Sequence, residues 1–204
     1  FIADQNAGDR GMFVPFFDRL ASAYKAIGLM AMQHDAVVIC GQARRLSGIT
    51  AERAAHAPAG SSDAMVRRSQ LLRYRIDVVD MFSSDDWSKH PDPLFYITAR
   101  YRRSIEAMVR RAPEQYLWMH RYWKSRPAFE KSGKPLPDKM VEKIAQLPWI
   151  TPSQLERIVD RGKQDAREAQ RAERGKGAGS SVIAPAGVVA DTPRAPGTSA
   201  SGVA

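Results

Sequence analysis

The chain has 204 residues, enough for one domain with a core of its own, and its 44% hydrophobic and 26% charged residues are typical of a globular protein. Its apolar runs all fall short of the roughly 18 residues that a membrane-spanning helix needs, so the sequence predicts no such helix within it. The formal net charge of +9 indicates an anionic partner, such as nucleic acid, an anionic membrane surface or an acidic ligand; the alternative is that the charge serves solubility alone.

The N-terminal end predicts a buried strand followed by a loop. Residues 1–3 are apolar, and residues 4–11 are polar and contain glycine, which is typical of a strand that ends in a turn. Residues 12–17 are apolar but contain Pro15, so we expect a loop or a short extended piece that packs inward.

The next two elements are predicted to be a helix and a second buried strand. Residues 22–33 are mostly apolar or small and indicate a helix, and residues 36–40 indicate a strand. A strand, a helix and a strand in this order predict a parallel βαβ unit. Cys40, the one cysteine, excludes an internal disulfide and is expected to be a small buried side chain in a reducing compartment.

The middle of the chain predicts an exposed loop and a long strand. Residues 50–63 are small and polar, as in an exposed loop, and residues 70–82 alternate as in a strand with one solvated face. The predicted apolar face carries Leu72, Tyr74, Ile76 and Val78, and the predicted solvated face carries Arg73, Arg75 and Asp77.

Two helices are predicted next. Asp92 as the cap and Pro93 at the first position predict a helix that continues to about residue 112, with apolar side chains at steps of three and four. Its arginines are expected to form a solvated face: Arg100, Arg102, Arg103, Arg110 and Arg111. Pro113 ends this helix, and residues 114–123 predict a second one.

Beyond Pro127 the sequence predicts a helical extension. Residues 131–137 resemble a linker and residues 138–146 a short amphipathic helix. Thr151 and Gln154 form a capping-box pattern that predicts the start of another helix. We therefore expect a domain over residues 1–127, a helical extension over 128–174 and a disordered Gly/Ala/Ser/Pro-rich tail over 175–204.

Three segments carry motifs in a characteristic order. The first segment comprises residues 3–8, Gly11, the Phe-Val-Pro-Phe-Phe run 13–17 and residues 21–22. The second is Ala36-Val37-Val38 with Arg44-Arg45. The third is the run Pro-Glu-Gln-Tyr-Leu-Trp-Met-His-Arg over 113–121, with Trp123-Lys124 and Arg126-Pro127. Over residues 1–127 this arrangement resembles the C-terminal part of the bacterial lipid A biosynthesis acyltransferases, in the lysophospholipid acyltransferase superfamily. Four positions depart from the family pattern: Asp18 and Asp35 stand where glycine is usual, and Ile39-Cys40 replaces Val-Pro.

The resemblance implies an α/β fold, an incomplete lysophospholipid-acyltransferase-like mixed sheet flanked by helices. Members of the family transfer a fatty acyl group from acyl carrier protein to a hydroxyl of a lipid A-type glycolipid. They do so at the cytoplasmic face of the inner membrane, generally with an N-terminal membrane helix, and no cofactor is expected.

The catalytic pair of the family is a His followed, after four residues, by Asp or Glu. The His takes the proton of the acceptor hydroxyl, and the carboxylate orients the imidazole. The residues five positions after His34, His56, His90 and His120 are Ile39, Ser61, Phe95 and Ser125, so no histidine here has this partner. We therefore assign no catalytic residue within the chain, expect it to be a fragment, and expect it to be inactive alone.

The resemblance implies acceptor-binding residues in the loop 4–11, which in the superfamily lies near the acceptor head group. Asp4 and Gln5 are expected to bond sugar hydroxyls, with Gly8 in the same loop, and Arg10 and Arg44 are expected to pair with phosphate. The alternative is that Asp4 and Gln5 only stabilise the loop.

The remaining expectations concern partners. In the segment 116–126 we expect Leu117 and Trp118 to pack in the core and the cations to face an anionic membrane, with His120 as a structural side chain. Acyl carrier protein is the expected donor and a glycolipid the expected acceptor. A non-catalytic lipid- or protein-binding relative is the alternative, and nucleic-acid binding is not expected, because no known nucleic-acid motif accompanies the charge.

Overall fold

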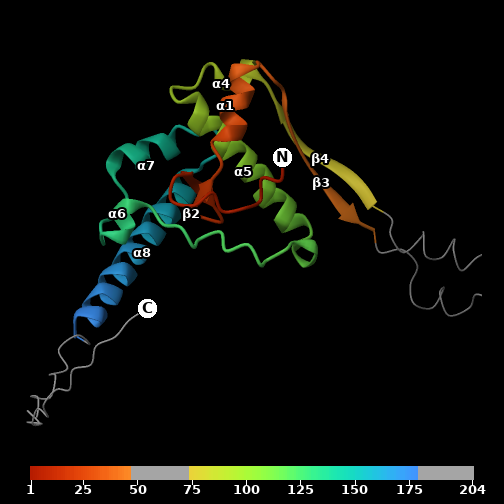
Figure 1. Cartoon of the computed structure of the whole chain (residues 1–204). Helices are drawn as coiled ribbons and strands as arrows, with labels where there is room; N and C mark the ends of the chain where they lie inside the picture. Colours follow the sequence, from red (N-terminus) through yellow and green to blue (C-terminus); the bar gives the residue numbers. More distant parts are fainter. Residues whose placement is uncertain (47–73, 179–204) are drawn as a thin grey trace, which may run out of the picture.

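A computed structural model describes residues 1–46 and 74–178 as a mixed α/β chain (Figure 1). Its strands form two antiparallel two-stranded sheets, β1–β2 and β3–β4, and the core gathers around the long helix α5. The predicted loop 50–63, the start of the predicted strand 70–82 and most of the predicted tail lie outside the described residues.

The first sheet is a hairpin that the sequence prediction missed. β1 (Met12–Phe16) pairs with β2 (Arg19–Ala23), and Val14, Phe16 and Leu20 are buried. Residues 12–17 do pack inward as expected, but as a strand that tolerates Pro15. Helix α1 (Ala26–Gln33) begins four residues later than predicted, because Ser22 and Ala23 belong to β2.

Asp18 and Asp35 both occupy the left-handed conformation that favours glycine. Their φ angles are +55° and +45°, so these two departures from the family pattern keep the backbone conformation of a glycine. Asp35 follows the last residues of α1, where the Ala36 amide donates to the Ala31 carbonyl in a helix-ending turn. Asp18 occupies the β1–β2 turn beside Phe17, whose φ is +51°.

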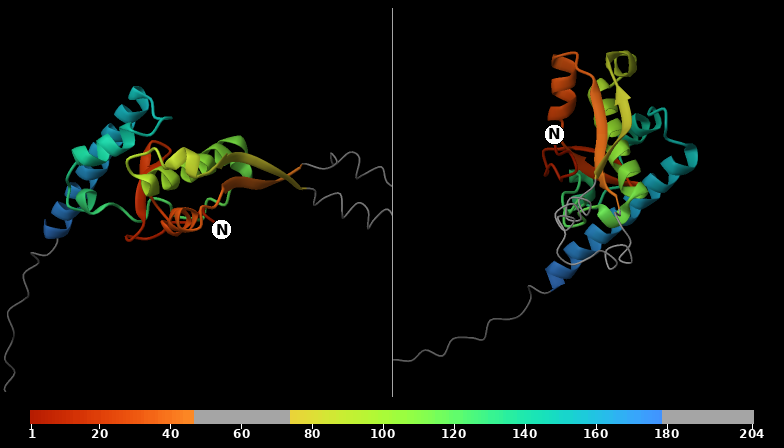
Figure 2. Two further views of the ribbon diagram at one scale, coloured as in Figure 1. Left: turned by 90° about the horizontal axis from the view of Figure 1, so that it is seen from above. Right: turned by 90° about the vertical axis from the view of Figure 1, so that its right-hand side faces the viewer.

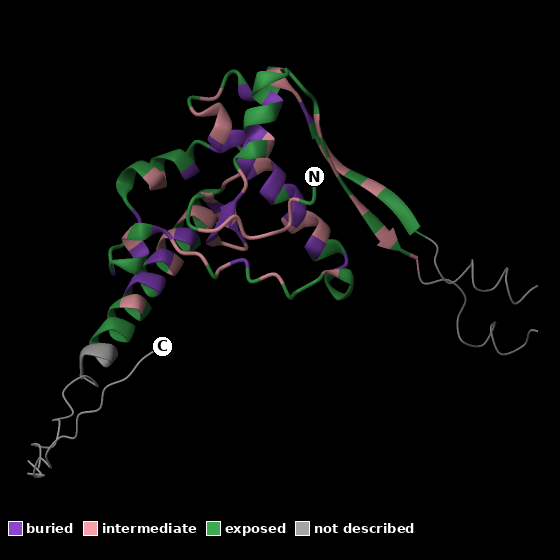
Figure 3. Cartoon of the chain, in the orientation of Figure 1, coloured by how far each residue is buried: buried purple, intermediate pink, exposed green. Residues whose placement is uncertain are grey.

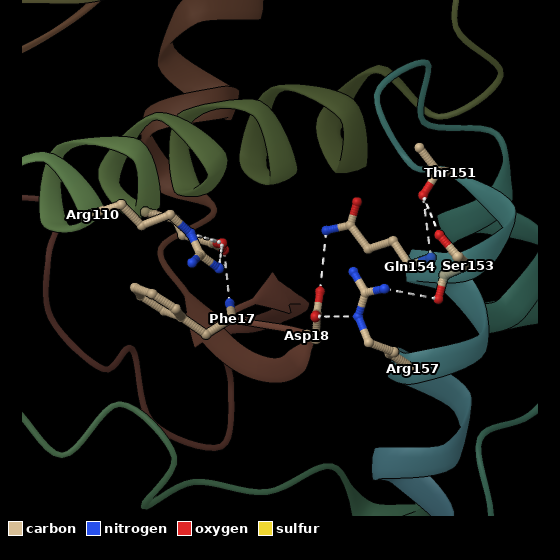
Figure 4. Close-up of polar contacts among 8 residues, drawn as sticks. Phe17, Asp18, Arg110, Thr151, Ser153, Gln154 and Arg157 are labelled. Carbon is tan, nitrogen blue, oxygen red and sulfur yellow. Dashed lines mark hydrogen bonds and ion pairs between the residues drawn. The ribbon is translucent and has the colours of Figure 1, made fainter.

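The Phe17–Asp18 turn is held from two helices (Figure 4). The Phe17 amide donates to Glu106 Oε2 of α5 at 2.7 Å, and Arg110 lies 4.6 Å from the centre of the Phe17 ring. On its other side, Asp18 accepts from Arg157 Nε at 2.7 Å and from Gln154 at 3.2 Å, both on α8. These contacts stabilise a turn that bulky residues rarely adopt.

Two substitutions of Asp18 distinguish the energetic cost of backbone strain at positive φ from the cost of losing the contact with α8. We expect Asp18→Ala to lower the free energy of unfolding by about 1.5–2 kcal/mol, because it loses a half-exposed ion pair and places a Cβ without a local partner at positive φ. Asp18→Gly should cost about 1 kcal/mol less than Asp18→Ala, since glycine removes the strain. Urea unfolding measures both. Equal losses for the two variants would contradict this account.

The second sheet replaces the parallel βαβ unit that the sequence predicted. β3 (Val38–Arg45) pairs antiparallel with β4 (Tyr74–Phe82), with a bulge at Cys40/Gly41. Residues 1–3 form no strand, so the parallel pairing is wrong for the described residues. The expected strand at 36–40 exists, but it starts at Val38 and continues to Arg45.

The β3–β4 ribbon presents its apolar face outward, the reverse of the expected orientation. Tyr74, Ile76 and Val78 are exposed, whereas Asp77 on the opposite face is half-buried and pairs with Arg44 at 3.1 Å. The ribbon projects from the rest of the described chain (Figures 1 and 2), and its outer residues are exposed or half-buried along most of its length (Figure 3).

Helix α5 (Pro93–Arg111) forms as predicted and is the centre of the core. The Asp92 carboxylate caps it by accepting from the Phe95 amide at 3.0 Å, and the short helix α4 (Ser84–Trp87) precedes it. Its arginines do not form one solvated face. Arg102 is fully buried, and Arg100 pairs with Asp80 at 2.9 Å.

The segment after α5 is irregular instead of helical. It begins with a 3-10 turn, η1 (Pro113–Gln115), after which Tyr116 is extended. Leu117 and Trp118 are more than half exposed, so the expectation that they pack in the core is wrong, while Tyr122 is buried.

The extension folds back onto the rest of the chain. It comprises α6 (Ala128–Lys131), α7 (Asp138–Ala145) and α8 (Pro152–Ala178), so α8 continues past Gly175, where we expected the tail to begin. The Gln154 amide donates to Thr151 Oγ1 at 3.2 Å, as the capping pattern predicted. Ile144, Leu147 and Ile158 join the common core.

Candidate functional site

The loop 3–11 is held in place by hydrogen bonds within it and to two other segments. Asn6 Nδ2 donates to the Arg121 and Tyr122 carbonyls at 3.1 and 2.9 Å, and Asn6 Oδ1 accepts from the Gly8 amide at 2.7 Å. Gly8 has φ +74°, a conformation natural to glycine, and its carbonyl accepts from the Ser22 hydroxyl. The loop is therefore a fixed part of the fold.

Arg102 is the strongest tether of this loop. Its guanidinium is fully buried and donates to three backbone carbonyls, those of Ser22 at 2.7 Å, Gln5 at 3.2 Å and Ala3 at 3.4 Å. It also lies 4.5 Å from the centre of the Tyr122 ring. The charge is thus balanced by carbonyl dipoles and aromatic faces, with no described carboxylate within ion-pair distance.

A cavity of about 640 Å³ opens beside the loop. Its walls come from the N-terminal residues, α1, β3 and α5, and they are largely apolar: Ile27, Met30, Val38, Ile105, Met108 and Val109. This volume and lining are typical of sites that bind small apolar ligands. Cys40 also lines the wall, and burial raises the pKa of its thiol, which therefore stays protonated at neutral pH.

Several polar groups meet this apolar wall. Asp4 Oδ1 and Gln42 Nε2 are both buried and have no hydrogen-bond partner among the described residues. The Tyr116 hydroxyl donates to the Tyr122 hydroxyl and lies 3.4 Å from the Asp4 carbonyl, and burial raises the pKa of Tyr116. Buried polar atoms without a partner are costly, so the Asp4 and Gln42 side chains are suited to a ligand that supplies hydrogen bonds.

The structure brings together two of the five predicted site residues. Asp4 and Arg44 both line the cavity, although Arg44 Nε is already bound by Asp77. Gln5 contributes its carbonyl to Arg102, Gly8 forms the turn, and Arg10 is exposed; none of these three lines the cavity.

Sequence reasoning missed the residues that hold the site. Arg102 lies on the same helix face as the buried side chains Thr98, Ile105 and Val109, at steps of three and four, a pattern that could have indicated its burial. Asn6 begins a four-residue Asn-Ala-Gly-Asp stretch, where an Asn side chain often bonds the backbone two residues on.

The described residues offer no metal site and no membrane span. Within residues 1–46 and 74–178, no three His, Cys, Asp or Glu side chains gather as metal ligands. No helix in the same part of the chain is long and apolar enough to cross a bilayer.

Comparison with known proteins identifies relatives. The family model for bacterial lipid A biosynthesis acyltransferases matches residues 1–125. Over 133 residues the chain is 32% identical to the lipid A biosynthesis palmitoleoyltransferase of Escherichia coli (strain K12), and equally to the lipid A biosynthesis acyltransferase of Shigella flexneri. Each match covers 65% of this chain and 35% of the relative, so the chain spans about a third of these relatives. No solved structure matches the chain.

Proposed function

Because the chain belongs to the bacterial lipid A biosynthesis acyltransferase family, we propose that it forms the acceptor-binding part of a membrane-associated acyltransferase. The proposed reaction moves a fatty acyl group from acyl carrier protein to a hydroxyl of a lipid A-type glycolipid. The observation that best supports the role of this part is the apolar cavity with the Asp4 side chain in its wall.

The reaction assigns different tasks to different groups. The acceptor hydroxyl attacks the thioester carbonyl, the carbon–sulfur bond breaks, and the thiol of the carrier leaves, while a base takes the hydroxyl proton. No histidine of this sequence has a carboxylate five positions on. We therefore place the catalytic base in a part of the enzyme that residues 1–204 do not span.

Asp4 is the residue of this chain best suited to orient the acceptor. Its Oδ1 has no hydrogen-bond partner in the part of the chain that the structure describes, so a small rotation into the cavity breaks no such bond and presents a carboxylate to a sugar hydroxyl. Arg44 supplies a cation in the same wall, held at Nε by Asp77. The apolar lining suits the hydrocarbon part of a lipid substrate.

The test compares residues 1–204 with the product of the complete reading frame. We expect residues 1–204 to show no acyl transfer with an acyl carrier protein donor, and a longer product carrying a His-x4-Asp/Glu motif to be active. In the longer product Asp4→Asn should lower kcat/KM by about 10- to 100-fold, since one charged hydrogen bond to the acceptor is weakened.

Two results would contradict the proposal. Turnover by residues 1–204 alone would show that the catalytic base lies within them. A reading frame without the His motif, in a protein that binds glycolipid but transfers nothing, would support the alternative of a non-catalytic relative. Arg111→Asn, at an exposed position outside the cavity lining, is the matched control and should leave kcat/KM unchanged.

A further inference from the structure

The outward face of the β3–β4 ribbon is a continuous apolar surface. Four cross-strand pairs lie on it, and all eight residues are exposed: Ile39–Met81, Gly41–Val78, Ala43–Ile76 and Arg45–Tyr74. Ile76 is 78% exposed and Val78 is 61% exposed. An antiparallel sheet normally turns its apolar face to the core, so this arrangement indicates a surface that is covered in the working protein.

The ribbon also has an unpaired edge. Among the described residues β3 pairs with β4 alone, and every β3 residue from Val38 to Arg44 lines the cavity, the outward ones included. Isolated two-stranded ribbons are marginally stable in water, and an open edge invites another strand. The open edge and the apolar face are therefore two parts of one incomplete surface, which we call the ribbon seam, and the adjoining cavity is the proposed acceptor site.

The charges of the ribbon argue against a lipid surface as the occupant. Arg44 and Arg75 lie on the opposite face, where both pair with Asp77, at 3.1 and 2.7 Å. Arg45, at one end, is the single cation among the eight outward residues. A surface that binds anionic head groups carries several cations beside its apolar side chains, and the ribbon seam does not.

We propose that the ribbon seam is an interface within the complete enzyme. The part of the acyltransferase fold that residues 1–204 do not span packs against it and covers it. The chain matches only 35% of the length of its relatives, so the family has ample polypeptide to fill it. Small residues at Gly41 and Ala43, opposite Val78 and Ile76, give a flat surface of the kind on which helices and added strands pack. This inference rests on the proposed function, which makes the chain one part of a longer enzyme.

Cysteine reactivity tests the seam without an activity assay. Cys40 is first replaced by Ser, and then Ile76→Cys, Val78→Cys or the control Met119→Cys is introduced, the last at an exposed position outside the ribbon strands and the cavity lining. In residues 1–204 all three thiols should react rapidly with a maleimide. In the product of the complete reading frame we expect positions 76 and 78 to react at least 10-fold more slowly, with position 119 unchanged.

Three outcomes of the reactivity experiment overturn the inference. Equal reactivity of positions 76 and 78 in both proteins shows that the longer polypeptide leaves the face uncovered. Protection in residues 1–204 that grows with protein concentration identifies a second copy as the occupant, and protection that requires phosphatidylglycerol vesicles identifies lipid. Protection at the seam without acyl transfer would refute the proposed function alone, and transfer with an unprotected seam would refute this inference alone.

Discussion

Arg102→Met is expected to lower the free energy of unfolding by about 2–4 kcal/mol. The substitution removes the donor of three backbone carbonyls, at Ala3, Gln5 and Ser22, and leaves them in a partly buried site. Loss of the buried charge offsets part of this cost, because a fully buried guanidinium without a carboxylate partner is expensive to desolvate. Urea unfolding gives the free energy directly.

The same variant should loosen the loop that carries Asp4. Amide hydrogen exchange over residues 4–8 is expected to accelerate more than exchange in the middle of α5, since the tether acts on the loop. Arg102→Lys should be intermediate, because an ammonium cannot reach three carbonyls as a guanidinium does. Arg111→Met, at an exposed arginine of the same helix, should change stability by no more than about 0.5 kcal/mol. Equal losses at positions 102 and 111 would refute the tether.

The elements that could be predicted from the sequence are those whose signals are local. Asp92 and Pro93 marked the start of α5, Thr151 and Gln154 marked the start of α8, and an amphipathic pattern marked α7. Caps and helical periodicity depend on residues within one or two turns, so they indicate a helix regardless of the tertiary contacts around it.

The elements that could not be predicted depend on distant partners. The β1–β2 hairpin turns through two non-glycine residues at positive φ, and this is possible because Glu106 and Arg157 hold the turn from elements far along the chain. The outward face of the ribbon was predicted to be buried because it carries the apolar residues of an alternating pattern. Alternation shows that the two faces of a strand differ, but which face is covered depends on the segments that pack against it.

The residues around the cavity could likewise be predicted only in part. Asp4 and Arg44 were expected from the family resemblance and do line one cavity. The residues that support the loop, Arg102 and Asn6, carry no family motif in this sequence and became visible through their contacts. The buried state of Arg102 shows how a single helix can mix solvated and core arginines.

The second large effect is expected at Asp165, where the extension meets the hairpin. Its carboxylate is almost fully buried and binds three arginines: Arg19 at 2.7 Å, Arg126 at 2.8 Å and Arg161 at 3.3 Å. These arginines come from β2, from the segment after α5 and from α8 itself, so one carboxylate joins three segments. Arg126 also pairs with Glu130 at 2.7 Å.

Asp165→Asn should lower the free energy of unfolding by about 3–5 kcal/mol at pH 7, because among the described residues Arg126 then keeps Glu130 as its ion-pair partner while Arg19 and Arg161 keep none. Glu130→Gln is the matched control, a buried carboxylate in the same cluster. Burial raises the pKa of Glu130, so its charged form costs stability as the pH rises, and removal of that charge offsets the lost ion pair. We expect Glu130→Gln to cost about 1 kcal/mol or less.

Urea unfolding of the two variants at pH 7 and pH 5 tests whether Asp165 has the central role in the cluster or whether any buried carboxylate there contributes equally to stability. Wild type should lose part of the Glu130 penalty at the lower pH, whereas the Glu130→Gln variant should not, since it has no such group to titrate. The expected order at pH 7 is wild type, then Glu130→Gln, then Asp165→Asn. If Glu130→Gln proved as damaging as Asp165→Asn, the extension would be held by the whole cluster of charges, and the central role of Asp165 would be wrong.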